Sequence, residues 1–267
     1  MPLEDGTNAE GEDLAKPLPS HWTKENINIT LYGSLASPPA CRIRALLELA
    51  GKPYERKSGF APKTKTSYSY RKIPVVFVSD GKETRQINDS HIIYKNLTPI
   101  LFPASGVGGV VAEGDLAIDK EVTYGLMLSC EKEAFSSRDC LNKFIEVAGL
   151  TGVSGFLLRN LLPSSFAKGA AEKIAAKNPD MKAPLEYYKD LKSELEKRGT
   201  PFFAGDEVGA LDASVYGAMC VWTAGGEKNM GFAEEALKKA GLESWYGKVK
   251  EKIPGVLEPM GSWPLYC

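Results

Sequence analysis

Residues 27–51 read INITLYGSLASPPACRIRALLELAG, in which a strand pattern is followed at once by a helix pattern. Residues 27–32 alternate apolar and polar side chains, which is typical of a strand with one buried face. Ser37 is a good N-cap, and the two prolines after it fit the first helical turn, where amide donors are unused. Gly51 fits the position just beyond a helix end. We therefore predict a strand over 27–32 and a helix that begins after Ser37 and ends before Gly51.

The next segments continue the alternation of strands and helices. Residues 53–57 are a candidate second strand, and residues 75–87 predict a hairpin whose turn contains Asp80-Gly81. Asn88-Asp89-Ser90 then predicts the start of a short helix that runs through Leu97. A small mixed sheet with helices on its faces satisfies this order, so we expect an α/β thioredoxin-like domain.

The second half of the chain has a different pattern. After about Gly114 the β-branched runs disappear and helical spacing dominates, which predicts an all-α helical bundle. Residues 98–114 are rich in proline and glycine and suit a connection between domains. We expect a polar extension over 1–26, a thioredoxin-like domain over 27–107 and an all-helical domain over 108–267.

Composition excludes several classes of function. The chain has 33 Lys and Arg against 34 Asp and Glu, so its net charge of -1 offers no field for nucleic acid or an anionic membrane. It contains five cysteines without metal-ligand spacing and two histidines, which argues against a structural metal site. The sequence contains no run of about 18 apolar residues, so it predicts no transmembrane helix. We expect reduced thiols in an intracellular compartment, cytoplasmic or organellar, with mitochondrion and plastid both open.

The first 26 residues form a polar segment with six acids, two lysines and three prolines. This composition fits neither a secretory signal nor an Arg-rich transit peptide, although a targeting segment removed before Met1 remains open. This composition is typical of a disordered segment, unless the segment docks on another protein surface. The chain's own helical domain, a second copy in a homodimer and a larger assembly are the alternatives, and we predict the larger assembly.

Ser37 is the first candidate site residue. It places a hydroxyl at a helix N-terminus, where free backbone amides and the helix dipole favour an anion such as a thiolate. The alternative is that Ser37 only caps the helix.

Two further segments could recognise an extended peptide. A cis bond between Ile73 and Pro74 would expose the backbone of Ile73 for pairing, whereas a plain strand-start proline is the alternative. Asp89 offers a carboxylate to an ammonium group, and Ser90 offers an amide and a hydroxyl to a carboxylate. Capping of the following helix explains that pair equally well.

Other conspicuous residues have more ordinary interpretations. Residues 52–72 contain seven basic residues and one acid, which could attract anions or could be solvated loop lysines. Cys41, one turn into the helix after Ser37, is interpreted as a packed thiol rather than a nucleophile. His91 has no acid-base partner nearby in the sequence.

Together, Ser37-Pro38, Ile73-Pro74 and Asp89-Ser90 resemble the glutathione site of the glutathione transferase superfamily, and the resemblance covers residues 27–262. It implies the glutathione transferase fold, with Ser37 facing the glutathione sulfur. It also implies that Ile73, before a cis Pro74, pairs with the cysteinyl backbone, and that Asp89 and Ser90 hold the γ-glutamyl end. In the second domain, residues 202–217 look like the helix-starting box of the superfamily, with Asp212 reaching back to cap the helix at Gly209.

Within the superfamily, residues 69–75 and 86–90 look most like the membrane-associated prostaglandin E synthases of type 2. That subgroup carries a Cys-Pro-x-Cys pair where this chain has Ser37-Pro38-Pro39-Ala40, so dithiol chemistry is implausible here. The resemblance implies a serine-type, glutathione-dependent transferase or isomerase that acts on a small hydrophobic electrophile. The alternative is a non-catalytic accessory or structural subunit of a larger complex, which keeps the scaffold without the reactive cysteines.

Overall fold

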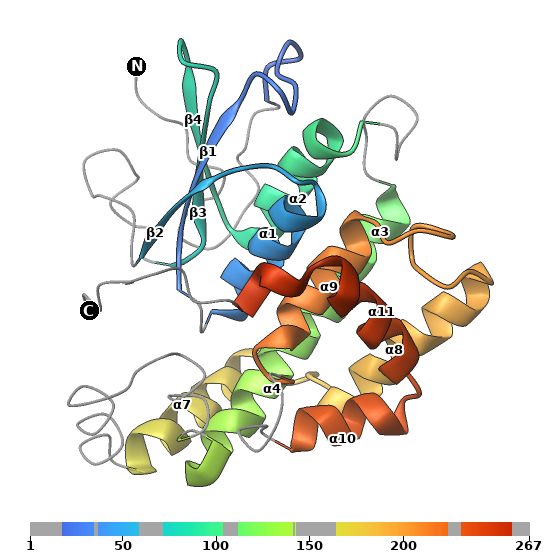
Figure 1. The fold of residues 1–267 in the computed structure, drawn as a ribbon. Helices are drawn as coiled ribbons and strands as arrows, with labels where there is room; N and C mark the ends of the chain where they lie inside the picture. The colour runs from blue at the N-terminus through green and yellow to red at the C-terminus, as the bar shows by residue number, and fades with distance from the viewer. Residues whose placement is uncertain are drawn as a thin grey trace.

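The computed structural model describes residues 18–34, 37–58, 72–103, 112–140, 142, 164–223 and 231–257. A four-stranded sheet and its helices form one part of the molecule, and a larger group of helices lies beside them (Figure 1). The fold class expected from the sequence, an α/β thioredoxin-like domain followed by an all-α domain, is confirmed. The expected boundary near Gly108 and most of the basic segment, residues 59–71, lie outside the described residues.

The sheet contains strands β1 (Asn28–Gly33), β2 (Glu55–Ser58), β3 (Val75–Ser79) and β4 (Thr84–Asn88) in the order β2-β1-β3-β4. β1 pairs in parallel with β2 and antiparallel with β3, and β3 and β4 form the expected hairpin. Asp80 Oδ1 accepts the amides of Lys82 and Glu83 at 2.9 and 2.8 Å, and Gly81 takes a φ of 90°. This turn chemistry is why the Asp-Gly pair closes the hairpin where the sequence predicted it.

Helix α1 (Pro38–Leu49) begins and ends where its capping residues predict. Gly51 follows it with a φ of 61°, a left-handed conformation that favours glycine. Helix α2 (Ser90–Leu101) is longer than expected, because the sequence indicated an end near Leu97 and the helix continues through Pro99. Leu97 and Leu101 are both buried, so packing outweighs the cost of the proline.

The core of the first domain lies between one face of the sheet and helices α1 and α2. One buried cluster contains Ile29 and Leu31 of β1, Val76 of β3 and residues from both helices. Trp22 belongs to the same cluster and is 4% exposed. Trp22, which falls in the segment expected as a polar extension, therefore packs into the core of the sheet domain.

In the described part of the second domain the regular secondary structure is helical, apart from an isolated bridge between Phe202 and Gly205. Its first segment runs as α3 (Glu113–Ala117), a π-helical stretch η3 (Ile118–Thr123) and α4 (Tyr124–Ser136). The others are α7 (Ser164–Lys177), α8 (Pro184–Arg198), α9 (Ala210–Cys220), α10 (Phe232–Lys239), α11 (Glu243–Lys252) and the short η5 (Pro254–Leu257). Among the described residues, none of the helices combines the length and the apolar character that crossing a membrane requires.

Helices α1 and α9 join the two domains. The fully buried α9 crosses α1 at Gly217, where an added Cβ would lie 2.5 Å from the Cys41 carbonyl oxygen. Cys41 and Ala45 of α1 belong to the core of the helical domain, whereas Ile43 and Leu46 belong to the core of the sheet domain. One helix therefore contributes side chains to two cores.

Candidate functional site

The three segments expected to form a site converge at one edge of the sheet. Tyr32, near the end of β1, pairs with Val75 at the start of β3, and Val75 pairs in turn with Asn88 at the end of β4. The chain leaves β1 toward Ser37 and leaves β4 into Asp89, and Pro74 immediately precedes β3. The strand register thus brings Ser37, Ile73-Pro74 and Asp89-Ser90 to the same edge, although they lie up to 53 positions apart in the sequence.

Ser37 caps α1 as its N-cap residue. Its Oγ accepts the amide of Ala40 at 3.4 Å, and its own amide donates to the carbonyl of Ser34 at 3.1 Å. Pro38 and Pro39 carry no N–H, so the first turn of α1 contributes few amide donors. The sequence argument expected free amides at this terminus and is corrected here. The hydroxyl of Ser37 and the helix dipole remain as the groups that could stabilise an anion.

The peptide bond between Ile73 and Pro74 is cis, which confirms the prediction. Ile73 is half-buried, while Pro74 is buried at the start of β3. Because β3 lies between β1 and β4 in the sheet, the bend lies between the ends of these two strands.

Asp89 has an unusual backbone. Among the described residues it is the one non-glycine residue with a positive φ, at 67° with a ψ of 131°. Its Oδ1 accepts the amide of His91 at 2.8 Å, so the carboxylate caps α2. A strained conformation held next to a helix terminus is typical of functional sites, where the surrounding structure maintains it.

Ser90 is more deeply placed than the sequence indicated. It is 4% exposed, and its Oγ accepts Nη1 of Arg42 at 3.0 Å. The hydroxyl expected to bind a ligand thus accepts a hydrogen bond from a guanidinium of α1.

Arg42 lies at the centre of a buried polar network between the domains. Its Nε donates to Ser214 Oγ of α9 at 3.0 Å, and its Nη2 pairs with Oδ1 of Asp119 in η3. Ser214 Oγ also donates to Asp119 Oδ1 at 2.6 Å, and His91 Nδ1 lies 2.7 Å from Asp119 Oδ2. Both Arg42 and Asp119 have side chains that are 0% exposed. The network therefore links α1 and α2 of the first domain to η3 and α9 of the second.

Burial alone would raise the pKa of Asp119. The charge of Arg42 and the hydrogen bonds from His91, Arg42 and Ser214 outweigh that effect and hold the pKa of Asp119 below its ordinary value. Asp119 is therefore a carboxylate at neutral pH, paired with the Arg42 guanidinium.

Sequence reasoning missed this network and found no partner for His91. Arg42 and Asp119 lie 77 positions apart, and no local pattern marks a charged residue as buried. A partial signal for the burial of Arg42 was present in the sequence, because this residue lies among the apolar residues of a predicted helix.

Cys41 behaves as the sequence indicated. It is 0% exposed, and its thiol is hydrogen-bonded to that of Cys220 in α9, which lowers the pKa of Cys41. Burial keeps it away from the surface, so it is a packed thiol. Among the described residues, no group of three or more His, Cys, Asp or Glu side chains is arranged to hold a metal ion.

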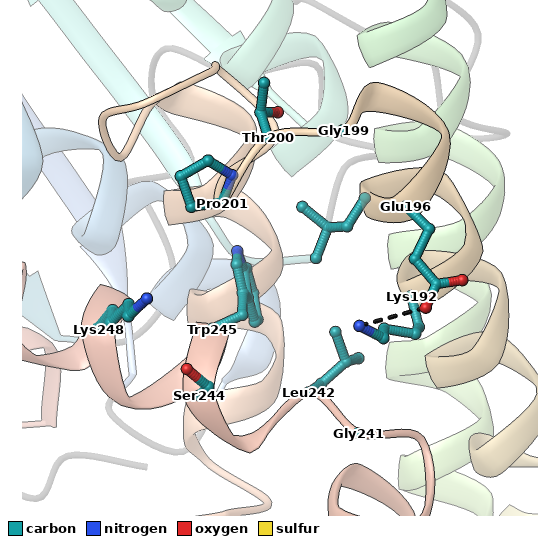
Figure 2. Close-up of a pocket in the computed structure, with 11 residues that line it drawn as sticks. Lys192, Glu196, Gly199, Thr200, Pro201, Gly241, Leu242, Ser244, Trp245 and Lys248 are labelled. Carbon is teal, nitrogen blue, oxygen red and sulfur yellow. Dashed lines mark ion pairs between the residues drawn. The ribbon is translucent and has the colours of Figure 1, made fainter.

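A separate groove of about 290 Å³ lies in the helical domain (Figure 2). Its wall contains Leu242 and Trp245 from the start of α11, with Lys192 of α8 and Lys248 of α11 at the sides. Lys192 Nζ forms an ion pair with Glu196 Oε1 at 3.3 Å. None of the residues that converge at the sheet edge lines this groove, so it is not the candidate site.

No protein-family model matches the sequence. Among solved structures, the chain is similar to rice GST1 in complex with glutathione, at 15% identity and a TM-score of 0.51, over 87% of this chain and 91% of that one. It is also similar to a glutathione S-transferase from Pseudomonas fluorescens Pf-5, at 18% identity and a TM-score of 0.48, over 86% and 99% of the two chains. The likeness to the rice structure shows that the chain has the glutathione transferase fold.

Proposed function

We propose that this chain binds glutathione at the sheet edge where Ser37, the Ile73-Pro74 bend and Asp89-Ser90 converge. The main support for this proposal is the convergence itself, which the strand register produces from three segments that are separated in the sequence. The fold supports the proposal, since the rice protein of the same fold was solved in complex with glutathione. The residues present fit the ligand, because the edge offers a hydroxyl, a backbone at a bend and a carboxylate.

Each segment has a separate role in the proposal. The Ser37 hydroxyl faces the sulfur, and the backbone of Ile73 pairs with the cysteinyl residue. The Asp89 carboxylate binds the γ-glutamyl ammonium group, and Ser90 contributes at the carboxylate end of the same group. Because the Ser90 Oγ already accepts a bond from Arg42, its backbone amide is its main contribution.

Bound glutathione would supply the sulfur nucleophile. Ser37 donates a hydrogen bond to the thiolate, which stabilises the deprotonated form and lowers the pKa of the thiol from about 8.5 toward neutrality. With Ser37-Pro38-Pro39-Ala40 in place of a Cys-Pro-x-Cys pair, these four positions bring no thiol to this edge. We therefore propose a serine-type transferase or isomerase that acts on a small hydrophobic electrophile. The resemblance to prostaglandin E synthases of type 2 supports this substrate class.

One observation favours a non-catalytic alternative. The two prolines that open α1 remove amides that would otherwise stabilise an anion, and the Ala40 amide is already bonded to Ser37. A scaffold with a weakened anion site suits an accessory subunit of a larger complex. Calorimetric titration with glutathione decides between the two, because absence of binding at millimolar glutathione would remove the enzyme proposal. Co-purification from the native source in a stoichiometric complex without transferase activity would support the alternative.

We predict that Asp89→Asn weakens glutathione binding about tenfold, because it removes the charge that would pair with the ammonium group. Asparagine tolerates a positive φ and can still accept the His91 amide, so the cap of α2 should persist. Isothermal titration calorimetry measures the change. Asp80→Asn is a matched control, since the Asp80 carboxylate accepts backbone amides in a turn, as Asp89 accepts the His91 amide, but lies at the opposite end of β3. Equal affinity in wild type and Asp89→Asn would contradict the assigned role.

We predict that Ser37→Ala raises the pKa of the bound thiol by about 1 to 2, because a hydrogen bond to a charged sulfur is lost. Thiolate absorbance followed across a pH series measures the change. The same substitution should lower the free energy of unfolding by about 1 kcal/mol through loss of the α1 cap.

Ser137→Ala is the control for the capping effect. Ser137 accepts the Cys140 amide at 3.4 Å, the same distance as in the Ser37 cap, so its replacement should affect stability alone. If the thiol pKa of the Ser37→Ala complex equals that of wild type, the helix dipole rather than the hydroxyl stabilises the thiolate.

A further inference from the structure

Two thiols meet where helices α1 and α9 cross. Cys41 of α1 and Cys220 of α9 are both 0% exposed and belong to the core of the helical domain. Their thiol groups are hydrogen-bonded to each other, and Cys220 Sγ lies 3.3 Å from the carbonyl oxygen of Gly217. Both cysteines are reduced in this structure. The fold therefore places side by side two thiols that come from different domains and lie far apart in the sequence.

The glycine at this crossing determines how closely the two helices approach. An added Cβ at Gly217 would lie 2.5 Å from the carbonyl oxygen of Cys41, so the backbones of α1 and α9 are in direct contact. Packed helices ordinarily have axes about 8–10 Å apart, whereas a disulfide requires Cα atoms roughly 4–7 Å apart. Cys220 follows Gly217 by one turn, on the same side of α9. The backbone contact thus provides the short separation that a disulfide between two helices needs.

The two thiols differ in their readiness to ionise. The hydrogen bond from Cys220 and the charge of Arg44 hold the pKa of Cys41 below its ordinary value, although burial acts in the opposite direction. Burial raises the pKa of Cys220, so this residue remains a protonated thiol. The thiolate is the form of cysteine that attacks an oxidant, and a neighbouring thiol can then complete a disulfide. Cys41 therefore suits the role of the attacking sulfur, and Cys220 that of the resolving sulfur.

Burial determines which oxidants reach this pair. Because Cys41 and Cys220 have no exposed surface, bulky disulfides cannot approach them, and both remain packed thiols in the resting protein. Hydrogen peroxide is uncharged and nearly as small as water, so brief local opening where the helices cross admits it. The oxidant class that fits the pair is therefore a small hydroperoxide.

We propose that Cys41 and Cys220 form a reversible disulfide when the protein meets hydrogen peroxide. The Cys41 sulfur attacks one peroxide oxygen, the O–O bond breaks, and Cys41 becomes a sulfenic acid as the first water leaves. The Cys220 sulfur then attacks the Cys41 sulfur, and its proton departs with the hydroxyl group as the second water. The two thiols thus lose two electrons, which the peroxide gains. Two equivalents of an external thiol return these electrons and restore the pair.

The disulfide fastens the sheet domain to the helical domain. It closes a loop of about 180 residues, which strongly restricts the unfolded chain. Its formation uses neither Ser37 nor the other residues at the sheet edge, and it requires no bound ligand. The inference is therefore independent of the proposed binding of glutathione.

Peptide mapping of the native chain after treatment with hydrogen peroxide tests the proposal. The remaining thiols are alkylated with N-ethylmaleimide in denaturant, and mass spectrometry should then find one cross-linked peptide pair that contains Cys41 and Cys220. The midpoint of thermal unfolding should rise by about 5–15 °C on oxidation and return after dithiothreitol. The proposal is overturned if both cysteines are still alkylated, if either pairs with Cys140, or if Cys41 is carried to sulfinic acid without a partner.

A variant and a matched control localise the effect. In Cys220→Ser the cross-link and the rise in the midpoint should both disappear, and Cys41 should stop at a sulfenic acid that dimedone traps. Serine can donate to the same Gly217 carbonyl, so this variant should keep the fold. Cys130→Ser is the control, because Cys130 is also 0% exposed in this core but is hydrogen-bonded to Tyr188, and its replacement should leave the cross-link intact.

The same rise in the midpoint in Cys220→Ser as in wild type would overturn the proposal. Loss of the cross-link in Cys130→Ser would do so as well, because it would assign the oxidised sulfur to another position. If Cys220→Ser fails to fold, peptide mapping of wild type and of Cys130→Ser still decides the question.

Discussion

Asparagine in place of Asp119 should lower the free energy of unfolding by about 3–5 kcal/mol. The substitution preserves the shape of the side chain but leaves the Arg42 guanidinium buried without a counter-charge. Removing one partner of a buried pair is costly, because the remaining charge can neither pair nor reach water. Chemical denaturation at neutral pH, followed by tryptophan fluorescence, measures the loss.

Asp115→Asn is the matched control for this substitution. Asp115 pairs with Arg198 Nη2 at 2.8 Å, but the two side chains are 25% and 23% exposed. A partly exposed pair of this kind contributes about 0–1 kcal/mol, since water and salt screen both charges. Similar losses from Asp115→Asn and Asp119→Asn would contradict the importance assigned to burial.

The pH dependence of stability follows from the lowered pKa of Asp119. The folded chain holds this pKa below the unfolded value of about 3.9, so the ionised carboxylate stabilises the fold at pH values above that point. The stabilisation is lost as the pH falls through the folded pKa. In Asp119→Asn this acid-sensitive component should be absent, so the difference between the two proteins should shrink below about pH 4. A constant difference from pH 7 to pH 3 would contradict it.

Alanine in place of Gly217 should destabilise the fold by about 3 kcal/mol. An added Cβ would lie 2.5 Å from the Cys41 carbonyl oxygen and 2.6 Å from the Arg42 Cα, so it would meet backbone rather than a movable side chain. Helices α1 and α9 would have to separate, and the Arg42–Asp119 pair beside the contact would be disturbed as well. Thermal and chemical unfolding measure the loss.

Gly247→Ala provides the comparison, because Gly247 is also helical but an added Cβ there has no neighbour within 4 Å. Alanine should stabilise α11 by about 0.5–1 kcal/mol through its better helix propensity. The opposite signs separate steric contact from propensity. A gain in stability from both substitutions would mean that α1 and α9 are not in close contact.

The elements with local signals were predicted correctly from the sequence. Helix α1 begins after Ser37 and ends before Gly51, and the β3–β4 hairpin turns at Asp80-Gly81, because capping and turn residues act within a few positions. The same holds for Asp212, whose Oδ2 accepts the Gly209 amide at 3.0 Å as expected. Asp212 also accepts from Phe203 and Trp245, contacts that span 9 and 33 positions and that no local pattern reveals.

The candidate site was predicted in part. The cis bond before Pro74 is confirmed, and Ser37, Ile73-Pro74 and Asp89-Ser90 do meet at one edge. The acceptor role of Ser90 toward Arg42 could not be predicted, since it depends on how α1 packs against α2. The shortage of amides at the start of α1 could have been foreseen, because proline has no N–H donor wherever it stands.

Through helix α1, the stability of each domain depends on the other. The apolar residues of α1 complete two separate cores, and its Arg42 guanidinium pairs with Asp119 in η3. A fragment cut after residue 103 would expose Cys41, Ala45 and an unpaired guanidinium along one side of this helix, and would aggregate rather than fold alone. The intact chain should consequently melt in a single step, with the two halves cooperating, and a ligand held at the start of α1 should protect both of them.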